Sequence, residues 1–228
     1  MTNLSQVKVV TVSVDYEDEL RLSLQANRKV FKSDYLVVTA PDNMNTIAIC
    51  REFGVSVLET DAFYRNRSVF NKWAGLEEGL DCLGRSGWIA ILDSDIVFPE
   101  TAEINLDERF LYTPQRKILQ DFSGGIPPES EWGSLPGIGH YEGFPGYAQI
   151  FHASAAPNET PWHRTDLGHA GCADTWFEEH WPRENHAHPN FEVVHLGKPF
   201  QNWVGKRLPE AQRNVLIKRA YKAQRIQL

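Results

Sequence analysis

The stretch WIAILDSDIVFP, residues 88–99, joins an apolar run to two carboxylates. Asp93 and Asp95 follow the run WIAIL, with only Ser94 between them, and the chain then becomes apolar again. Side chains two positions apart on an extended chain point to the same side, so both carboxylates can face one point in space. Two carboxylates that close repel each other unless a cation lies between them or one is protonated. The stretch therefore predicts a buried strand that ends either in a turn capped by the aspartates or in a metal site.

Strands and helices alternate through the first hundred residues. Runs of β-branched and apolar residues predict strands, and the segments between them carry apolar residues at helical spacing. Besides the opening stretch, the predicted strands are 7–14, 34–40 and 55–60, and the predicted helices are 16–31, 43–53 and 69–84. This order is typical of an α/β fold in which helices cover both faces of a parallel sheet, and ligands bind such sheets beyond the carboxyl ends of the strands. Asp93 and Asp95 lie at such an end.

The pattern changes after about residue 100. The predicted elements there are strands at 110–119, 147–153 and 191–197 and helices at 174–181 and 209–224, and NHAHPN (185–190) is interpreted as a polar turn. The segment 123–146 is rich in Gly and Pro and contains Trp132, Tyr141 and Phe144. Long irregular segments inside compact domains are usually functional or disordered, and the three aromatic residues favour a binding loop. We expect a single domain with an elaborated second half.

The composition is that of an ordinary globular protein. The chain has 228 residues, of which 42% are hydrophobic and 23% charged, and a net charge of −7. It lacks a run of about 20 apolar residues and a signal-like N-terminus, and its three cysteines are widely spaced, so we expect a cytoplasmic protein with reduced thiols and no membrane span. From Lys198 onward there are eight Lys or Arg and one acidic residue. This basic segment is either a solvated helix surface or a contact for a phosphate-bearing partner.

The segment ILDSDIVFP resembles the D-x-D segment of nucleotide-sugar-dependent glycosyltransferases of the GT-A fold. The resemblance implies a GT-A-like, Rossmann-like fold, in which a mostly parallel sheet has helices on both faces. It also implies that Asp93 and Asp95 hold a divalent metal, Mn²⁺ or Mg²⁺, on the diphosphate of the sugar donor. Three further segments, one before this stretch and two after it, stand in the order that the family has them.

RSVFNKWAGLEEGL (67–80) is similar to a segment of the family in which a basic residue precedes a helix of the form N-K-x-x-x-x-N-x-G. Asn71 and Lys72 are in register, whereas Glu77 or Glu78 stands in place of the second Asn. The helix packs beside the donor in the family.

HAGCADTWFEEHWP (169–182) resembles the acceptor segment G-x-E-D-x-x-F-x-x-R-W. Asp174 matches the Asp that serves as general base in inverting members, although Ala173 and His180 replace the Glu and the Arg of the pattern. The competing interpretation is an Asp that only caps the N-terminus of a helix. FEVVHLG (191–197) resembles the C-terminal strand that often supplies a third metal ligand, here His195.

The resemblance therefore implies three sets of residues. The metal ligands are Asp93, Asp95 and His195. The donor-binding residues are Val12, Ser13, Asp15, Tyr16, Asp42, Arg67, Asn71, Lys72, Asp93, Ser94, Lys198 and Lys206, with Asn202 and Trp203 near the diphosphate. The catalytic base is Asp174, and the acceptor-binding residues are Trp132, Tyr141, Trp162 and Trp176.

The predicted reaction moves a sugar from a nucleoside-diphosphate sugar, a UDP-sugar foremost, to a hydroxyl of a glycan or of modified DNA. Residues 1–100 would bind the donor and 101–228 the acceptor. One alternative is a nucleotidyltransferase of related fold, although VSVDYED lacks the Gly-rich basic loop of such enzymes. The other is a non-catalytic carbohydrate-binding protein. The absence of G-x-G-x-x-G and of G-x-x-x-x-G-K-[ST] disfavours dinucleotide-binding enzymes and P-loop NTPases.

Overall fold

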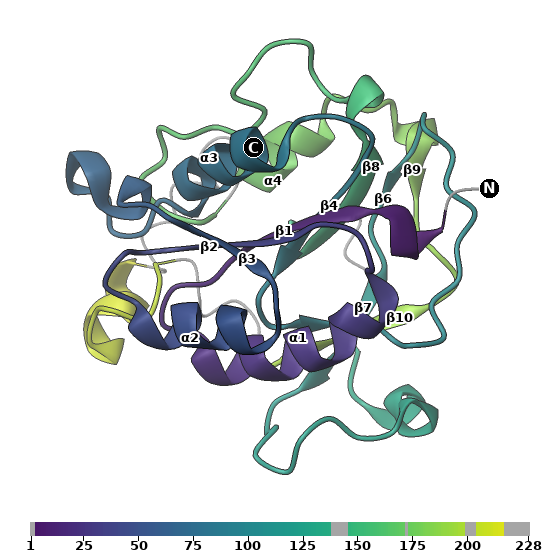
Figure 1. Ribbon diagram of the computed structural model, residues 1–228, viewed down its shortest axis with the longest axis horizontal. Helices are drawn as coiled ribbons and strands as arrows, with labels where there is room; N and C mark the ends of the chain where they lie inside the picture. The colour runs from purple at the N-terminus through teal and green to yellow at the C-terminus, as the bar shows by residue number, and fades with distance from the viewer. Residues whose placement is uncertain (1–2, 138–145, 172, 199–203, 217–228) are drawn as a thin grey trace.

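A seven-stranded sheet forms the centre of the computed structural model, which describes residues 3–137, 146–171, 173–198 and 204–216 (Figure 1). In order across the sheet, the strands are β3 (Ser56–Glu59), β2 (Tyr35–Thr39), β1 (Lys8–Val12), β4 (Trp88–Asp93), β8 (Ala148–His152), β6 (Leu111–Tyr112) and β9 (His186–Ala187). The first four strands are parallel to one another. Strand β8 is antiparallel to both of its neighbours, and β9 is parallel to β6. The mostly parallel α/β sheet expected from the sequence is confirmed.

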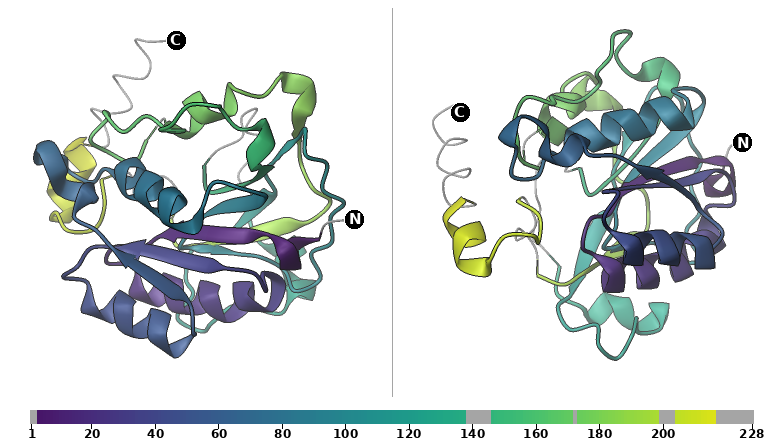
Figure 2. Two further views of the ribbon diagram at one scale, coloured as in Figure 1. Left: turned by 45° about the horizontal axis from the view of Figure 1, so that its top comes forward. Right: turned by 60° about the vertical axis from the view of Figure 1, so that its left-hand side comes forward.

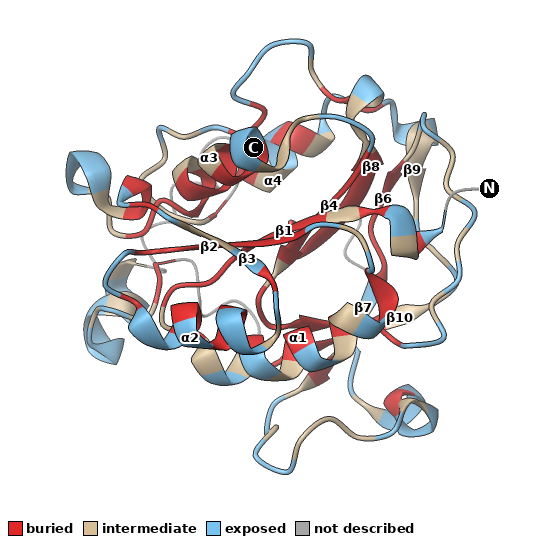
Figure 3. Ribbon diagram, viewed as in Figure 1, coloured by how far each residue is buried: buried red, intermediate tan, exposed pale blue. Residues whose placement is uncertain are grey.

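Helices cover both faces of this sheet, as Figure 2 shows from two further directions. Helices α1 (Glu17–Val30) and α2 (Met44–Glu52) lie on one face, and α3 (Lys72–Leu83) and α4 (Ala173–Glu178) lie on the other (Figure 1). Val9 packs with Leu20 of α1, whereas its neighbour Val10 packs with Leu76 of α3. The central strands β1, β2, β4 and β8 are largely buried, and the outer sides of the helices are exposed (Figure 3). Burial on both faces explains why the strands are continuously apolar in sequence.

A second, three-stranded sheet begins where β4 ends. Its strands are β5 (Ile96–Val97), β10 (Glu192–Leu196) and β7 (Gln115–Leu119), with β10 in the middle. Strand β10 is antiparallel to β5 and parallel to β7. The chain therefore leaves the large sheet at Asp93 and enters the small sheet at Ile96, and only Ser94 and Asp95 lie between the two.

The structure differs from three of the expectations about secondary structure. Residues 110–119 form two strands in different sheets, β6 and β7, because Pro114 lies between them and proline has no backbone N–H for a ladder. The interpretation of 185–190 as a polar turn is wrong at His186 and Ala187, which pair with β6 as the edge strand β9. The described part of 123–146 contains a 3₁₀ helix, Glu129–Ser134.

The last predicted helix begins at residue 210 and is helical up to 216, and its remainder lies outside the described residues. None of the helices in the described ranges is long and apolar enough to cross a membrane.

Candidate active site

The first carboxylate of the DSD motif, Asp93, is paired with a lysine. Asp93 is the last residue of β4, and its backbone N–H donates to the carbonyl of Tyr147 at 2.8 Å. Its carboxylate accepts a hydrogen bond and ion pair from Lys72, which lies in the first turn of α3 and is nearly buried. The Lys72 ammonium also lies 4.6 Å from the ring centre of Trp73. The Asp93 carboxylate is therefore directed toward α3, where the ammonium of Lys72 balances its charge.

The second carboxylate, Asp95, lies beside His195. Both residues are 5% exposed, and the Nε2 atom of His195 is 3.5 Å from an oxygen of Asp95. Strand pairing fixes this geometry, because His195 is opposite Ile96 and the Leu196 N–H donates to the Asp95 carbonyl at 2.8 Å. The turn is held from the other side by the Ser23 hydroxyl, which donates to the Ser94 carbonyl at 2.7 Å.

The Asp95–His195 pair can hold a divalent cation. Two ligand atoms bound to one ion at about 2.1 Å lie roughly 3.0–3.5 Å apart, so the observed 3.5 Å fits. A carboxylate together with an imidazole suits Mn²⁺ better than Mg²⁺. Burial raises the pKa of Asp95, and the neighbouring Asp93 adds to this rise against the opposing effect of His195. A cation at this position would favour the ionised form of the carboxylate.

The complete predicted ligand set is not assembled in the described parts of the chain. There, no group of three or more His, Cys, Asp or Glu is arranged to hold a metal ion. The Asp93 carboxylate would have to turn from Lys72 toward Asp95 to complete the set. The assignment of all three ligands thus stays a prediction.

Asp174 lies near the Lys72–Asp93 pair, and Gly146 connects the two. Asp174 is in the first turn of α4, and its carboxylate accepts the Gly146 N–H at 2.8 Å. The Gly146 carbonyl in turn lies 3.5 Å from the Lys72 ammonium. A Cβ atom on residue 146 would lie 2.5 Å from the Asp174 Cβ and 3.0 Å from the Trp73 ring, so the contact requires glycine. The predicted base is therefore brought to the carboxyl end of β4.

A buried polar network lies behind these residues and was not foreseen from the sequence. Glu77 of α3 accepts the backbone N–H groups of Trp162 and His163 at 3.0 and 2.9 Å, the His163 Nδ1–H at 2.7 Å and an Arg85 N–H at 2.7 Å. The His163 ring is stacked between Trp73, at 4.8 Å, and Phe177, at 4.3 Å. It thus ties the loop before α4 to α3. The sequence signals for Glu77 were its place on the apolar face of a predicted helix and its position, or that of Glu78, where the family pattern has its second Asn.

Burial dominates the pKa of His163, whereas hydrogen bonds and charge dominate the pKa of Glu77. Burial lowers the pKa of His163, which therefore stays neutral, although Glu77 acts in the opposite direction. Burial alone would raise the pKa of Glu77, but the hydrogen bonds from His163 and Arg85 and the charge of Arg85 outweigh it and hold that pKa below its usual value.

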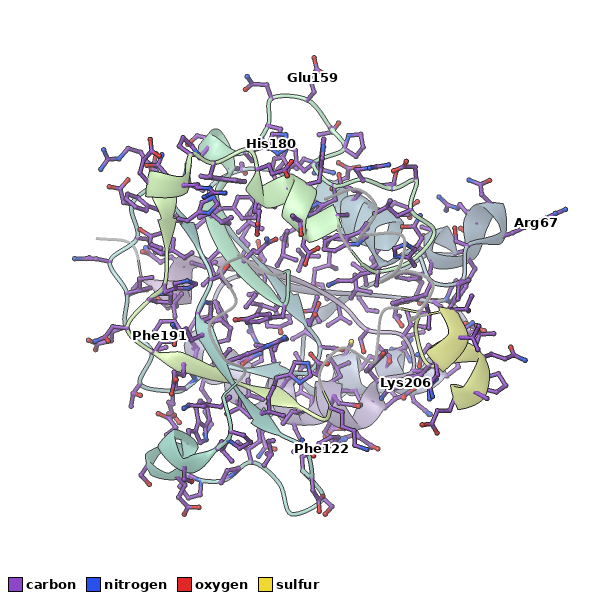
Figure 4. All side chains as sticks on the ribbon, turned by 180° about the vertical axis from the view of Figure 1, so that it is seen from behind. Arg67, Phe122, Glu159, His180, Phe191 and Lys206 are labelled. Atoms are coloured by element: carbon purple, nitrogen blue, oxygen red, sulfur yellow. The ribbon has the colours of Figure 1, made fainter. Side chains whose placement is uncertain are left out.

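Two lysines predicted to bind the diphosphate lie beside the metal candidate. Lys198 and Lys206 both line a pocket of about 230 Å³, together with Leu196, which follows His195, and Arg213. Lys206 also pairs with Glu19 at 2.6 Å. Its ammonium lies 3.9 Å from the ring centre of Tyr16, another predicted donor-binding residue. Figure 4 shows Lys206 beside the N-terminal part of α1.

Other predicted donor-binding residues have structural partners. Val12 and Ser13 are buried at the end of β1. Asn71 is the N-cap of α3, because its side chain accepts the Ala74 N–H at 3.1 Å, and it also donates to the Thr165 carbonyl at 2.6 Å.

Arg67 lies away from the DSD motif. It is exposed, and its side chain points outward from the molecule in Figure 4. It borders a pocket of about 670 Å³ formed by residues 65–69, the first turn of α3, residues 165–169, Val204 and Leu216. None of Asp93, Asp95, Asp174 and His195 lines this pocket.

The four aromatic residues predicted to bind the acceptor differ in position. Trp132 packs in the core of the small sheet and Trp162 in the core under α3, and both indole N–H groups donate to backbone carbonyls. The structure therefore does not bring these two to the site surface. Trp176 on α4 is 37% exposed and lies edge-on to His180. Tyr141, like Asn202 and Trp203, lies outside the described residues.

Asp15 and Asp42 are brought together by a residue that the sequence did not single out, Arg207. Its guanidinium donates to Asp15 at 2.9 Å and to both oxygens of Asp42 at 2.9 and 2.7 Å. It also lies over the ring of Tyr64, at 4.7 Å from the ring centre. The only signal in the sequence was the basic character of the C-terminal segment.

No protein-family model matches the chain, and no curated protein matches it either. Among solved structures, glucosyl-3-phosphoglycerate synthase from Mycobacterium tuberculosis in complex with phosphoglyceric acid is similar at a TM-score of 0.52 and 10% identity, over 94% of this chain and 76% of that one. The same enzyme in complex with Mn²⁺, UDP and glucosyl-3-phosphoglycerate gives 0.51 at the same identity and coverage. A cytidylyltransferase from Leptospira borgpetersenii gives 0.40 at 14% identity, over 71% of this chain and 68% of that one. The two synthase structures, with TM-scores above 0.5, thus show that the chain has a GT-A-like fold.

Proposed function

We propose that the protein is a divalent-metal-dependent glycosyltransferase, which transfers a sugar from a nucleoside-diphosphate sugar to an acceptor hydroxyl. One observation carries the proposal: the buried Asp95–His195 pair, Lys72–Asp93 and Asp174 lie together at the carboxyl end of β4. The fold adds support, because one neighbour of this fold was solved with Mn²⁺ and UDP. Ligands of such sheets bind at this edge.

The residues divide into donor and acceptor functions. Asp95 and His195, with Asp93 after it turns from Lys72, would hold the metal ion. When bound, the ion would neutralise charge on the departing nucleoside diphosphate as a Lewis acid. Lys198 and Lys206 would contact the same phosphates from the pocket beyond β10. Lys72, once released from Asp93, would be a further cation for the leaving group.

Asp174 would accept the proton of the acceptor hydroxyl, provided that the enzyme inverts the anomeric centre. The Gly146 N–H holds one carboxylate oxygen, which leaves the other for the hydroxyl. Trp176, exposed on the same short helix, would offer a ring face to a sugar acceptor. The proposal keeps the donor side expected in residues 1–100 and the acceptor side expected in 101–228, except that His195, Lys198 and Lys206 of the second half would act on the donor.

Calorimetry combined with a product assay tests the function. Nucleoside diphosphates should bind only weakly without Mn²⁺ and clearly with it, and a panel of nucleotide sugars should release nucleoside diphosphate when an acceptor is present. Asp95→Asn should abolish the metal-dependent part of nucleotide binding, whereas Asp121→Asn, a change of an exposed aspartate that accepts the nearby Ser123 N–H, should not. Metal-independent binding, or release of pyrophosphate from a nucleoside triphosphate and a sugar phosphate, would contradict the proposal, and the second result would indicate a nucleotidyltransferase.

A further inference from the structure

The guanidinium of Arg207 lies at the ends of the first two strands, where the proposed donor would place its nucleoside. Asp15 follows β1 and Asp42 follows β2, and these strands are neighbours in the large sheet. Asp15 has a left-handed backbone, with φ of 62°. Figure 2 shows the segment 204–216, in yellow, beside the loops at this edge.

The three contacts of Arg207 describe the ligand that this position selects. Its two terminal N–H groups donate in parallel to the two oxygens of Asp42, its Nε–H donates to Asp15, and its plane covers Tyr64. The group that fits is thus planar, stacks on an aromatic ring and carries two adjacent N–H donors. A carboxylate recognises this pattern in bidentate fashion.

Among the nucleobases, guanine has this pattern. Its N1–H and N2–H groups flank one carbon and are themselves part of a guanidine unit. Uracil presents a single N–H between two carbonyl oxygens, which a carboxylate repels. Cytosine and adenine present an amino group beside a ring nitrogen that only accepts. The second carboxylate, Asp15, suits ribose hydroxyls, since acidic residues beyond such strands accept hydrogen bonds from them.

Resting on the proposed function, we propose that Tyr64, Asp42 and Asp15 form a guanosine subsite for the donor and that Arg207 occupies it in the nucleotide-free chain. The incoming guanine replaces the guanidinium on Asp42 and Tyr64, and the ribose replaces it on Asp15. The donor is then a GDP-sugar, in place of the UDP-sugar expected from the sequence. Arg207 acts as an internal competitor that makes binding weaker and sensitive to the position of the C-terminal segment.

The segment around Arg207 is anchored by contacts that the change Arg207→Ala does not touch. Val204 and Gly205 are buried. A Cβ atom at Gly205, where φ is +67°, would lie 3.0 Å from the Phe70 ring. Lys206 keeps its pair with Glu19. The variant therefore empties the subsite without displacing its surroundings.

Calorimetric titration with GDP, UDP, CDP and ADP in Mn²⁺ tests the inference on four proteins. These are the unmodified chain, Arg207→Ala, Arg207→Ala with Asp42→Asn, and the control Arg109→Ala, which removes an exposed arginine paired with Asp107 far from β1 and β2. Arg207→Ala should bind GDP about tenfold more tightly than the unmodified chain and about tenfold more tightly than UDP. The added Asp42→Asn should remove the preference for GDP, because an amide accepts only one of the two N–H groups. Arg109→Ala should bind the four nucleoside diphosphates with the same affinities as the unmodified chain.

Each other result overturns the inference. Weaker or unchanged GDP binding in Arg207→Ala shows that Arg207 does not compete with the nucleotide. UDP binding as tight as GDP binding in that variant shows that the subsite does not select guanine. In both cases metal-dependent nucleotide binding remains and the proposed function survives. If no nucleoside diphosphate binds any of the four proteins, the proposed function and this inference fall together.

Discussion

His195 and Asp95 face each other across the β5–β10 pair, with Nε2 of the histidine 3.5 Å from a carboxylate oxygen of the aspartate. Two adjacent backbones hold this spacing, so it exists before any ion binds. A preformed pair of ligands lowers the ordering cost of metal binding.

If the proposed site is correct, removing the side chain of either Asp95 or His195 should weaken metal binding. We expect Asp95→Asn and His195→Gln each to weaken the affinity for Mn²⁺ by tenfold or more, as measured by calorimetry. In thermal denaturation, a hundredfold excess of Mn²⁺ over its dissociation constant should stabilise the unmodified chain by about 2.7 kcal/mol and the variants by much less. The control Asp121→Asn should have the same Mn²⁺ affinity and the same stabilisation by Mn²⁺ as the unmodified chain. Equal Mn²⁺ affinity in all proteins would remove Asp95 and His195 from the ligand set.

In the proposed site, Lys72 would compete with a metal ion for Asp93. Replacing it by Met removes the cation beside two carboxylates, so we expect tighter Mn²⁺ binding in the absence of nucleotide. The same variant should bind nucleoside diphosphates more weakly, because a phosphate contact is lost. Lys117→Met, which removes a lysine paired with Glu192, is the matched control. A loss of both affinities would mean that Lys72 only supports the fold.

Asp174→Asn tests the general base. The amide oxygen can still accept the Gly146 N–H, so the helix should keep its position. We expect the turnover number to fall by about 10²-fold or more while donor affinity stays unchanged. Glu179→Gln, in the exposed turn after α4, is the control. A normal turnover number in Asp174→Asn would leave Asp174 with its hydrogen bond to Gly146 as its only role.

Glu77→Gln should be the most destabilising of these changes. The carboxylate is 8% exposed and holds Arg85 and His163. Breaking a buried ion pair from one side costs about 3 kcal/mol, since the partner charge stays buried. Urea denaturation should show this loss. Glu78→Gln, which changes a more exposed glutamate paired with Arg65, should cost well under about 1 kcal/mol.

His163 and Glu77 should both make the protein less stable in acid. The pKa of His163 is lowered by folding, so below its ordinary value of about 6.5 the unfolded chain binds a proton that the folded chain does not. Stability is complete above that pH and falls as the pH drops toward the folded value. The pKa of Glu77 is also lowered, so its contribution is complete above about 4.5 and is lost at lower pH.

The variant His163→Phe keeps the ring between Trp73 and Phe177 but removes the proton site. Its unfolding free energy, measured by urea titration between pH 4.5 and 7, should depend less on pH than that of the unmodified chain. An identical pH dependence would show that His163 titrates equally in both states.

The sequence predicts the fold well where one rule dominates. Continuous apolar runs between amphipathic helices are characteristic of a parallel sheet buried on both faces, and the structure confirms β1 to β4 and α1 to α3 close to the expected ranges. The second half is less predictable because its strands are short and their partners are distant in sequence. Pro114 gives no sign of which sheet each flanking strand joins, and β9 is too short for a periodic pattern.

The residues of the candidate site were likewise predictable only in part. Asp93, Asp95 and His195 stand at strand ends, and the strand order alone brings them to one region. Arg207, in contrast, reaches Asp15 and Asp42 from more than 160 residues away through a loop, for which periodicity carries no information. Trp132 and Trp162 show the limit of composition, because an aromatic residue in a Gly- and Pro-rich loop can face the core as readily as a ligand.

The turn between Asp93 and Asp95 is also the junction between the large sheet and the small sheet. Asp93 ends β4 of the large sheet, Asp95 lies between the two sheets, and His195 belongs to the small sheet. An ion held by Asp93, Asp95 and His195 would cross-link the two sheets at a single point. Donor binding would then make the junction between the sheets more rigid. The backbone mobility of β7 and β10 would therefore depend on whether the donor site is occupied.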